Sequence, residues 1–96
     1  MISIRYDNRA NKDLEVIYLT ILEDKKNAAA EFINKIDNYI KLLETNPEMG
    51  KECRASGFNR DCRVLYYENY TILYKIHKEH ISIKRVLSSK QNNKGN

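Results

Sequence analysis

Three strand-like runs follow one another in the second half of the chain, with only short turns between them. They extend from Asp61 to Tyr67, from Tyr70 to Ile76 and from Ile81 to Leu87. The first turn is built on Glu68-Asn69 and the second on the residues from His77 to His80. Because turns of this length join neighbouring strands that run in opposite directions, the sequence predicts a three-stranded antiparallel meander.

One strand and two amphipathic helices are predicted ahead of the meander. Ile2, Ile4 and Tyr6 alternate with polar residues, as in a half-buried strand. Asp7 and Asn8 can cap the first helix, and the polar run 24–27 separates it from the second. The apolar residues recur at helical spacing: Ala10, Leu14, Ile17 and Ile21 in the first helix, and Ala29, Phe32, Ile33, Ile36, Tyr39, Ile40 and Leu43 in the second.

The second helix is predicted to end before Pro47, because the residue that precedes a proline is disfavoured in helical geometry. Residues 51–60 read as an irregular loop. The order of elements predicts an α+β fold of two layers, in which a helical hairpin packs on one face of the sheet. Residues 1–87 are expected to form one domain, and residues 88–96 a polar, flexible tail.

Positive charge is concentrated in the sheet half of the chain. Residues 1–48 carry seven basic and nine acidic side chains, a net of −2, whereas residues 49–96 carry ten and four, a net of +6. This asymmetry favours an anionic partner for the second half. The chain shows neither a signal peptide nor an apolar run long enough to span a bilayer, so we expect a soluble, cytoplasmic protein that does not bind membranes.

The cysteines and histidines are interpreted as structural rather than catalytic. Cys53 and Cys62 are expected to be free thiols in a reducing compartment, with a disulfide the less favoured alternative. Their spacing, together with that of His77 and His80, matches no zinc pattern, so neither a metal nor another cofactor is expected. The two histidines fall on an exposed turn, without the partner or pocket that catalysis requires.

The aromatic residues and Arg85 allow alternative interpretations. Tyrosines cluster in the meander, at positions 66, 67, 70 and 74, where they can stabilise the sheet or offer a stacking platform for single-stranded nucleic acid. Simple alternation places Arg85 on the same face as Ile83 and Leu87. It must therefore find a carboxylate, reach past the sheet edge, or lie at a bulge that turns it outward.

Several local strings, in this order and at this spacing, resemble the RelE/ParE superfamily of type II toxins. They are Asp13-Leu14 with Ile17, Ala28-Ala29-Ala30 with Phe32, Pro47-Glu48-Met49-Gly50-Lys51, Tyr70-Thr71-Ile72-Leu73-Tyr74-Lys75-Ile76 and Ile81-Ser82-Ile83-Lys84-Arg85-Val86-Leu87. RelE-like members carry an arginine after the tyrosine of the middle strand, where this chain has Thr71. They also carry an arginine, histidine or tyrosine just past the last strand, where this chain has the run Ser88-Ser89-Lys90-Gln91. The Pro-Glu-Met-Gly string and the Arg-Val-Leu ending resemble the ParE-like branch, although that branch often has a histidine where Ser88 stands.

The resemblance implies a toxin that inhibits DNA gyrase, is neutralised by a cognate antitoxin, and meets operator DNA only through that antitoxin. Target contact is expected from the basic residues Lys51, Arg54, Arg60, Arg63, Lys84, Arg85 and Lys90. One alternative is a RelE-like endoribonuclease acting on ribosome-bound mRNA, with Arg63, Arg85 and Lys90 holding the phosphate. Another is an inactive relic that retains only antitoxin binding.

Overall fold

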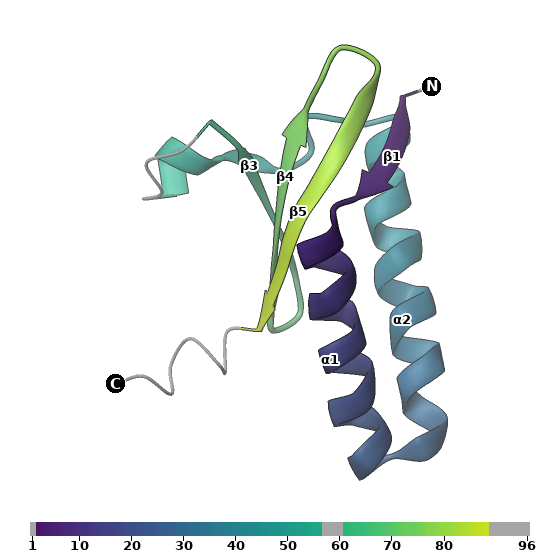
Figure 1. The fold of residues 1–96 in the computed structure, drawn as a ribbon. Helices are drawn as coiled ribbons and strands as arrows, with labels where there is room; N and C mark the ends of the chain where they lie inside the picture. Colours follow the sequence, from purple (N-terminus) through teal and green to yellow (C-terminus); the bar gives the residue numbers. More distant parts are fainter. Residues whose placement is uncertain (1, 57–60, 89–96) are drawn as a thin grey trace.

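A five-stranded sheet forms the centre of the computed structural model, which describes residues 2–56 and 61–88 (Figure 1). The strands lie in the order β1-β5-β4-β3-β2. Their bounds are Ser3–Tyr6 for β1, Lys51–Glu52 for β2, Arg63–Tyr67 for β3, Tyr70–Ile76 for β4 and His80–Ser88 for β5. The predicted α+β class and the antiparallel meander β3-β4-β5 are confirmed.

The turn between β3 and β4 is as short as the sequence predicts. Tyr67 pairs with Tyr70, so Glu68 and Asn69 form the whole connection. Glu68 has a φ of 53°, a left-handed conformation of the kind that two-residue hairpin turns require. The next turn is closed by the His77 N–H, which donates to the carbonyl of His80 at 2.8 Å.

The first strand joins the meander in the parallel sense. β1 pairs with β5 from Ser3 opposite His80 to Tyr6 opposite Ile83. The connection from β1 back to the sheet contains the helical hairpin, because parallel strands need a long crossover. The Asp7 N–H extends the pairing by donating to the Ile83 carbonyl at 3.0 Å, after which the chain enters the first helix.

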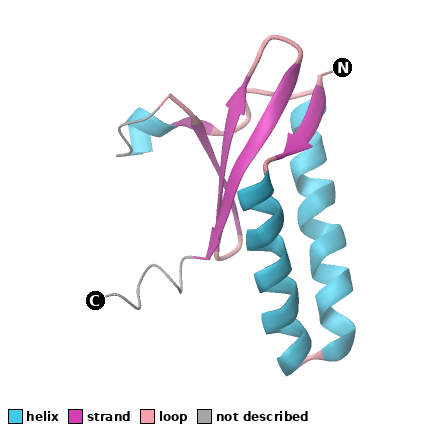
Figure 2. Cartoon of the chain, viewed as in Figure 1, coloured by secondary structure: helices cyan, strands magenta, loops and turns pink. Residues whose placement is uncertain are grey.

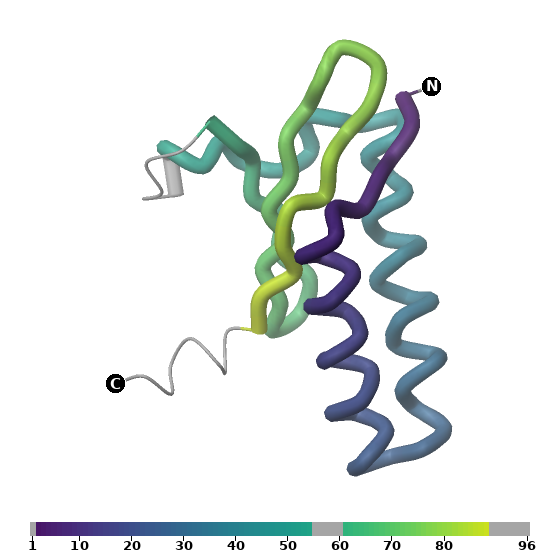
Figure 3. Tube along the Cα trace, in the orientation of Figure 1, coloured from purple at the N-terminus to yellow at the C-terminus, as the bar shows by residue number. Residues whose placement is uncertain are grey.

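Two helices pack side by side on one face of the sheet (Figures 2 and 3). α1 spans Asn8–Asp24 and α2 spans Lys26–Lys41, followed by the short 3-10 helix η1, Leu42–Glu44. Lys25 alone separates the helices, so the connection is shorter than the predicted run of four residues. The Asn46 side chain donates to the Leu42 carbonyl at 3.3 Å, which satisfies one of the acceptors left free at the helix end.

The main core lies between the helical hairpin and the sheet. Its buried side chains are Ala10, Ile17, Ile36, Ile40, Leu43, Leu65, Ile72, Tyr74, Ile81, Ile83 and Val86. Phe32 and Tyr39 on α2 extend it by contacting Tyr67 and Tyr70 on the sheet, with ring centroids 5.0–6.0 Å apart. Three of the four clustered tyrosines thus stabilise the packing of helix on sheet, while Tyr66 is exposed.

Three sequence-based expectations need correction. The irregular loop predicted at 51–60 begins with β2 and the 3-10 helix η2, Cys53–Ser56, so the described chain has five strands rather than four. Ser88 belongs to β5 rather than to the polar tail, and residues 89–96 lie outside the described part. Asp7 precedes α1 but makes no side-chain capping bond, and its carboxylate pairs with Lys84 instead. No helix in the described ranges is long and apolar enough to cross a membrane.

Candidate target-binding face

The face of the sheet opposite the helices differs sharply from the core face. Leu65, Ile72 and Val86 lie in register across β3, β4 and β5 and belong to the main core. The next register row contains Val64, Leu73 and Arg85 and therefore points the other way, because side chains alternate along a strand. Val64 and Leu73 form a second apolar cluster there with Cys53 and Cys62. We call this side of the sheet the open face.

Two hollows, with volumes of about 380 and 450 Å³, lie at this side of the sheet. The larger is on the open face, and the smaller reaches past the end of the open face to Arg63 and Ile76, which lie in core-facing register rows. Asp61, Cys62 and Lys75 line both of them, so the hollows are neighbours. The first also includes Glu52, Arg54, Arg63 and Ile76, and the second includes Asp7, Arg9, Leu73, Lys84 and Arg85. Six basic and three acidic side chains thus surround the pair, which makes it suited to an anionic or carbonyl-rich surface.

Arg85 satisfies two of the alternatives left open by the sequence, because it finds a carboxylate and lies at a bulge. Leu73 pairs with Arg85 and Tyr74 pairs with Ile83, so Lys84 is the extra residue of β5. The bulge moves Arg85 out of the apolar row and lets it reach Asp13 on α1. Its Nε donates to Oδ2 at 2.7 Å and its Nη2 to Oδ1 at 3.0 Å. The hydrogen bond that Arg85 donates to the Asp13 carboxylate raises the pKa of Arg85, so the guanidinium stays charged.

Arg63 is fixed at the opposite edge of the sheet. Its guanidinium donates to the Gly50 carbonyl from Nε at 3.2 Å and from Nη2 at 2.8 Å, and Nη2 also reaches the Glu48 carbonyl at 3.3 Å. The buried Tyr74 hydroxyl holds the same segment, because it accepts from the Gly50 N–H at 2.9 Å and donates to the Pro47 carbonyl at 2.8 Å. The Pro47–Gly50 string therefore has a structural basis in two anchoring side chains.

The remaining predicted residues are distributed around the open face. Lys51 and Arg54 are exposed on β2 and η2, and Lys84 pairs with Asp7 at 3.2 Å. Arg60 and Lys90 lie outside the described residues. Arg9 and Lys75 also line the hollows, although neither is among the basic residues predicted for target contact. The strand alternation of Lys75 with Leu73 was a signal that could have identified it; nothing in the sequence places Arg9 near β5.

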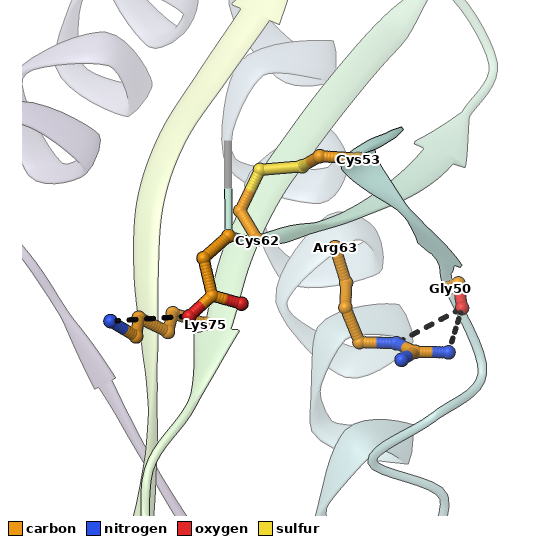
Figure 4. The surroundings of a disulfide bond; sticks show 6 residues. Gly50, Cys53, Cys62, Arg63 and Lys75 are labelled. Carbon is orange, nitrogen blue, oxygen red and sulfur yellow. Dashed lines mark hydrogen bonds and ion pairs between the residues drawn. A yellow bond between two sulfur atoms is a disulfide. The ribbon is translucent and has the colours of Figure 1, made fainter. Parts of the chain in front are cut away.

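The two cysteines are joined in a disulfide, which corrects the expectation of free thiols (Figure 4). Their Cα atoms are 5.2 Å apart, and the Cys53 N–H donates to the Cys62 carbonyl at 2.8 Å. The pairing of β2 with β3 brings the two residues together: Glu52 lies opposite Arg63, so the cysteines that follow and precede them become neighbours. Figure 4 shows the bond near the contacts of Arg63 with Gly50.

The histidines form a stacked pair at the β4–β5 turn. The ring centroids of His77 and His80 are 4.4 Å apart, with 14° between the planes. Desolvation lowers the pKa of His77, as do the nearby charges of His80, Lys75 and Lys84. Neither histidine lines the hollows. Within the described ranges, no three side chains from histidine, cysteine, aspartate or glutamate gather as a metal site requires.

Comparison with known proteins gives a consistent result. The family model described as "ParE toxin of type II toxin-antitoxin system, parDE" matches residues 4–93, almost the whole chain. A solved structure, the chromosomal ParDE toxin–antitoxin system from P. aeruginosa, is similar in fold, with a TM-score of 0.77 and 18% sequence identity. The match covers 92% of this chain and 96% of that one. No curated protein sequence matches this chain significantly.

Proposed function

Because the chain belongs to the ParE toxin family of type II toxin–antitoxin systems, we propose that it inhibits DNA gyrase and is neutralised by a cognate antitoxin. The observation that carries the proposal is the family match over residues 4–93. The fold agrees with it, since the chain aligns along nearly its full length with a chain of a ParDE system. The proposed setting is the bacterial cytoplasm, where gyrase acts.

The open face is the proposed contact surface for gyrase. Lys51 and Arg54 are the exposed cations at its β2–η2 end, and Arg63 stands beside them. Lys84 and Arg85 supply charge at the other end, while Arg60 and Lys90 remain in the proposal on sequence grounds alone. A surface of this kind binds by complementary charge and hydrogen bonding and needs no covalent chemistry.

The arrangement of the arginines favours inhibition by binding over RNA cleavage. The ribonuclease alternative requires Arg63 and Arg85 to act together on one phosphate. Arg63 is held towards Gly50 on the β2 side, whereas Arg85 is held towards Asp13 on the α1 side. The two guanidinium groups are therefore directed away from each other across β4 and line different hollows.

The cognate antitoxin is the second proposed partner, and operator DNA would be reached only through it. The chain offers a mainly apolar hollow of about 710 Å³ beside β4, lined by Asn46, Pro47, Glu48, Met49 and Ile76. An amphipathic segment can fill such a hollow, and an extended segment can pair with an exposed strand edge. An acidic antitoxin would complement the net +6 of residues 49–96.

The test combines cells and purified proteins. The chain is induced from a repressed promoter in bacteria that carry an SOS reporter, and purified toxin is titrated into gyrase supercoiling and DNA-cleavage assays. We expect growth arrest, reporter induction and loss of supercoiling. Growth arrest with a silent reporter and cleaved mRNA would contradict the gyrase proposal and support the RelE-like ribonuclease. Soluble protein that causes no growth arrest would support the inactive relic.

The contact surface is tested by charge reversal. Lys51→Glu/Arg54→Glu changes two exposed side chains and should abolish gyrase inhibition without unfolding the chain. The matched control is Lys12→Glu/Lys26→Glu, which makes the same change in charge at exposed helical positions. Equal loss of inhibition in both variants would attribute the effect to net charge and refute a localised contact.

A further inference from the structure

The two sulfurs of the Cys53–Cys62 disulfide differ in accessibility. The Cys53 side chain has no exposed surface and packs with Val64 and Leu73. Cys62 is only partly buried and lines both hollows, which Cys53 does not. A reagent that enters either hollow therefore reaches Cys62 first. Because disulfide exchange requires access to one sulfur, this asymmetry defines where the bond can be attacked.

We infer that the disulfide is a reversible thiol-exchange site, attacked at Cys62, whose reduction weakens target binding; this regulation rests on the proposed function. The thiolate of an external low-molecular-weight thiol attacks Cys62 Sγ and forms a mixed disulfide. The bond between the cysteines breaks, and Cys53 leaves with the electron pair as a thiolate and takes a proton. A second external thiol then attacks the mixed disulfide at the sulfur atom that came from the first external thiol, and Cys62 leaves as a thiolate and takes a proton. Two external thiols are thereby oxidised to one disulfide, and the cysteine pair gains two electrons and two protons.

The bond bears on how one basic residue, Arg54, is placed relative to another, Arg63. Arg54 directly follows Cys53, Arg63 directly follows Cys62, and both arginines line the hollow of about 380 Å³. The contacts of Arg63 with Gly50 do not involve sulfur, so we expect them to persist after reduction of the disulfide. Arg54 has no such anchor in the part of the chain that the structure describes. Together with the short pairing of β2 with β3, the disulfide therefore fixes the backbone of Arg54 relative to that of Arg63.

Beyond Gly50, which Arg63 and Tyr74 anchor, few backbone contacts hold β2 and η2 against the sheet. β2 contains only two residues, which pair with Val64 and Arg63, and one further hydrogen bond links the Cys53 N–H to the Cys62 carbonyl. So short an edge strand opens easily once the covalent bond is removed. Because a preorganised surface loses less conformational freedom on binding, the oxidised form should bind the target more tightly than the reduced form.

The chemical half of the inference is tested without gyrase. Wild-type protein is equilibrated in mixtures of reduced and oxidised glutathione and quenched with acid, and its free thiols are counted by maleimide mass shift. The count should change reversibly between zero and two. Cys53→Ser should acquire one glutathione at Cys62, whereas Cys62→Ser should acquire far less at the buried Cys53. Equal labelling of both variants, or two free thiols in every mixture, would overturn the inference.

The regulatory half compares the two redox forms in the supercoiling assay. Reduction should raise the toxin concentration needed for half-inhibition about tenfold, a typical coupling between two sites. Cys53→Ser/Cys62→Ser should behave like the reduced form and ignore added thiol. Gyrase alone in each buffer is the control. Equal inhibition by both forms refutes the regulation, whereas inhibition by neither form refutes the gyrase proposal and leaves the labelling experiment to decide the exchange chemistry.

Discussion

Removal of the Asp13 carboxylate tests the strongest polar link between the helical hairpin and the sheet. Asp13 accepts three hydrogen bonds: two from the Arg85 guanidinium at 2.7 and 3.0 Å, and one from the Val86 N–H at 2.9 Å. β1 stops pairing with β5 at Ile83, so beyond that point α1 takes over and Asp13 satisfies a backbone donor that no strand reaches. We therefore expect Asp13→Ala to destabilise the fold while leaving the main core unaltered.

The magnitude follows from burial. The side chains of Arg85 and Asp13 are 28% and 16% exposed, so the pair lies between a surface and a buried ion pair. Loss of one partner of a buried pair costs about 3–5 kcal/mol, but Arg85 can partly rehydrate, which reduces the expected loss to about 2–3 kcal/mol. For a chain of this size that corresponds to a fall in melting temperature of about 10–20 °C.

Equilibrium urea unfolding of the oxidised protein, followed by circular dichroism, measures this loss. Glu31→Ala is the matched control, because it breaks the Lys35–Glu31 pair, whose side chains are 62% and 67% exposed, and should cost only about 0–0.5 kcal/mol. A double-mutant cycle with Arg85→Ala separates the pair from the Val86 contact. If Asp13→Ala costs no more than Glu31→Ala, the assignment of Asp13 as the link between α1 and β5 is wrong.

Three further predictions concern the segment held by Tyr74 and the anchoring of β1. Gly50→Ala should lower stability by about 1–3 kcal/mol in urea unfolding, because the new Cβ would lie 2.5 Å from the Val64 carbonyl oxygen. Tyr74→Phe leaves the buried Gly50 N–H without its acceptor and should cost about 1–3 kcal/mol in the same assay; a negligible change would show that the segment is held elsewhere. Burial and the hydrogen bond to Asp37, 2.6 Å long, raise the pKa of Tyr6 above its ordinary value of 10. The protonated Tyr6 hydroxyl therefore contributes its full share to the free energy of unfolding below about pH 10, and this share declines as the pH rises further. The difference in unfolding free energy between wild type and Tyr6→Phe should therefore shrink in unfolding curves measured at rising alkaline pH.

The sequence predicted the elements whose signal is periodic. The apolar positions of both helices and the three strands of the meander repeat often enough to be recognised, and Tyr70–Ile76 coincides with β4 residue for residue. β2 has only two residues, which is too short to show any alternation, so its sequence is typical of a loop. The partner of a strand cannot be read from periodicity either. The parallel pairing of β1 with β5 was therefore found only in the structure.

The candidate site was predicted less completely than the fold, for two different physical reasons. A reducing compartment favours free thiols, whereas the proximity of the two cysteines depends on the pairing of β2 with β3, which the sequence does not show. Arg85 was recognised as anomalous because a charge interrupts an apolar alternation. Its actual environment depends on a bulge in β5 and on the docking of α1, and neither of these is local to residue 85.

Internal pairing redistributes the charge that the sequence places on the sheet half. Lys84 is paired with Asp7, Lys75 with Asp61 and Arg85 with Asp13, so much of the cationic charge beside β4 and β5 is balanced within the chain. Lys51 and Arg54 are exposed, and neither pairs with a carboxylate in ranges 2–56 and 61–88. The net excess on the open face therefore lies towards β2 and η2 rather than at the centre of the sheet. Since η2 begins at Cys53, the charge available to a target and the bond that positions it occupy the same corner of the molecule.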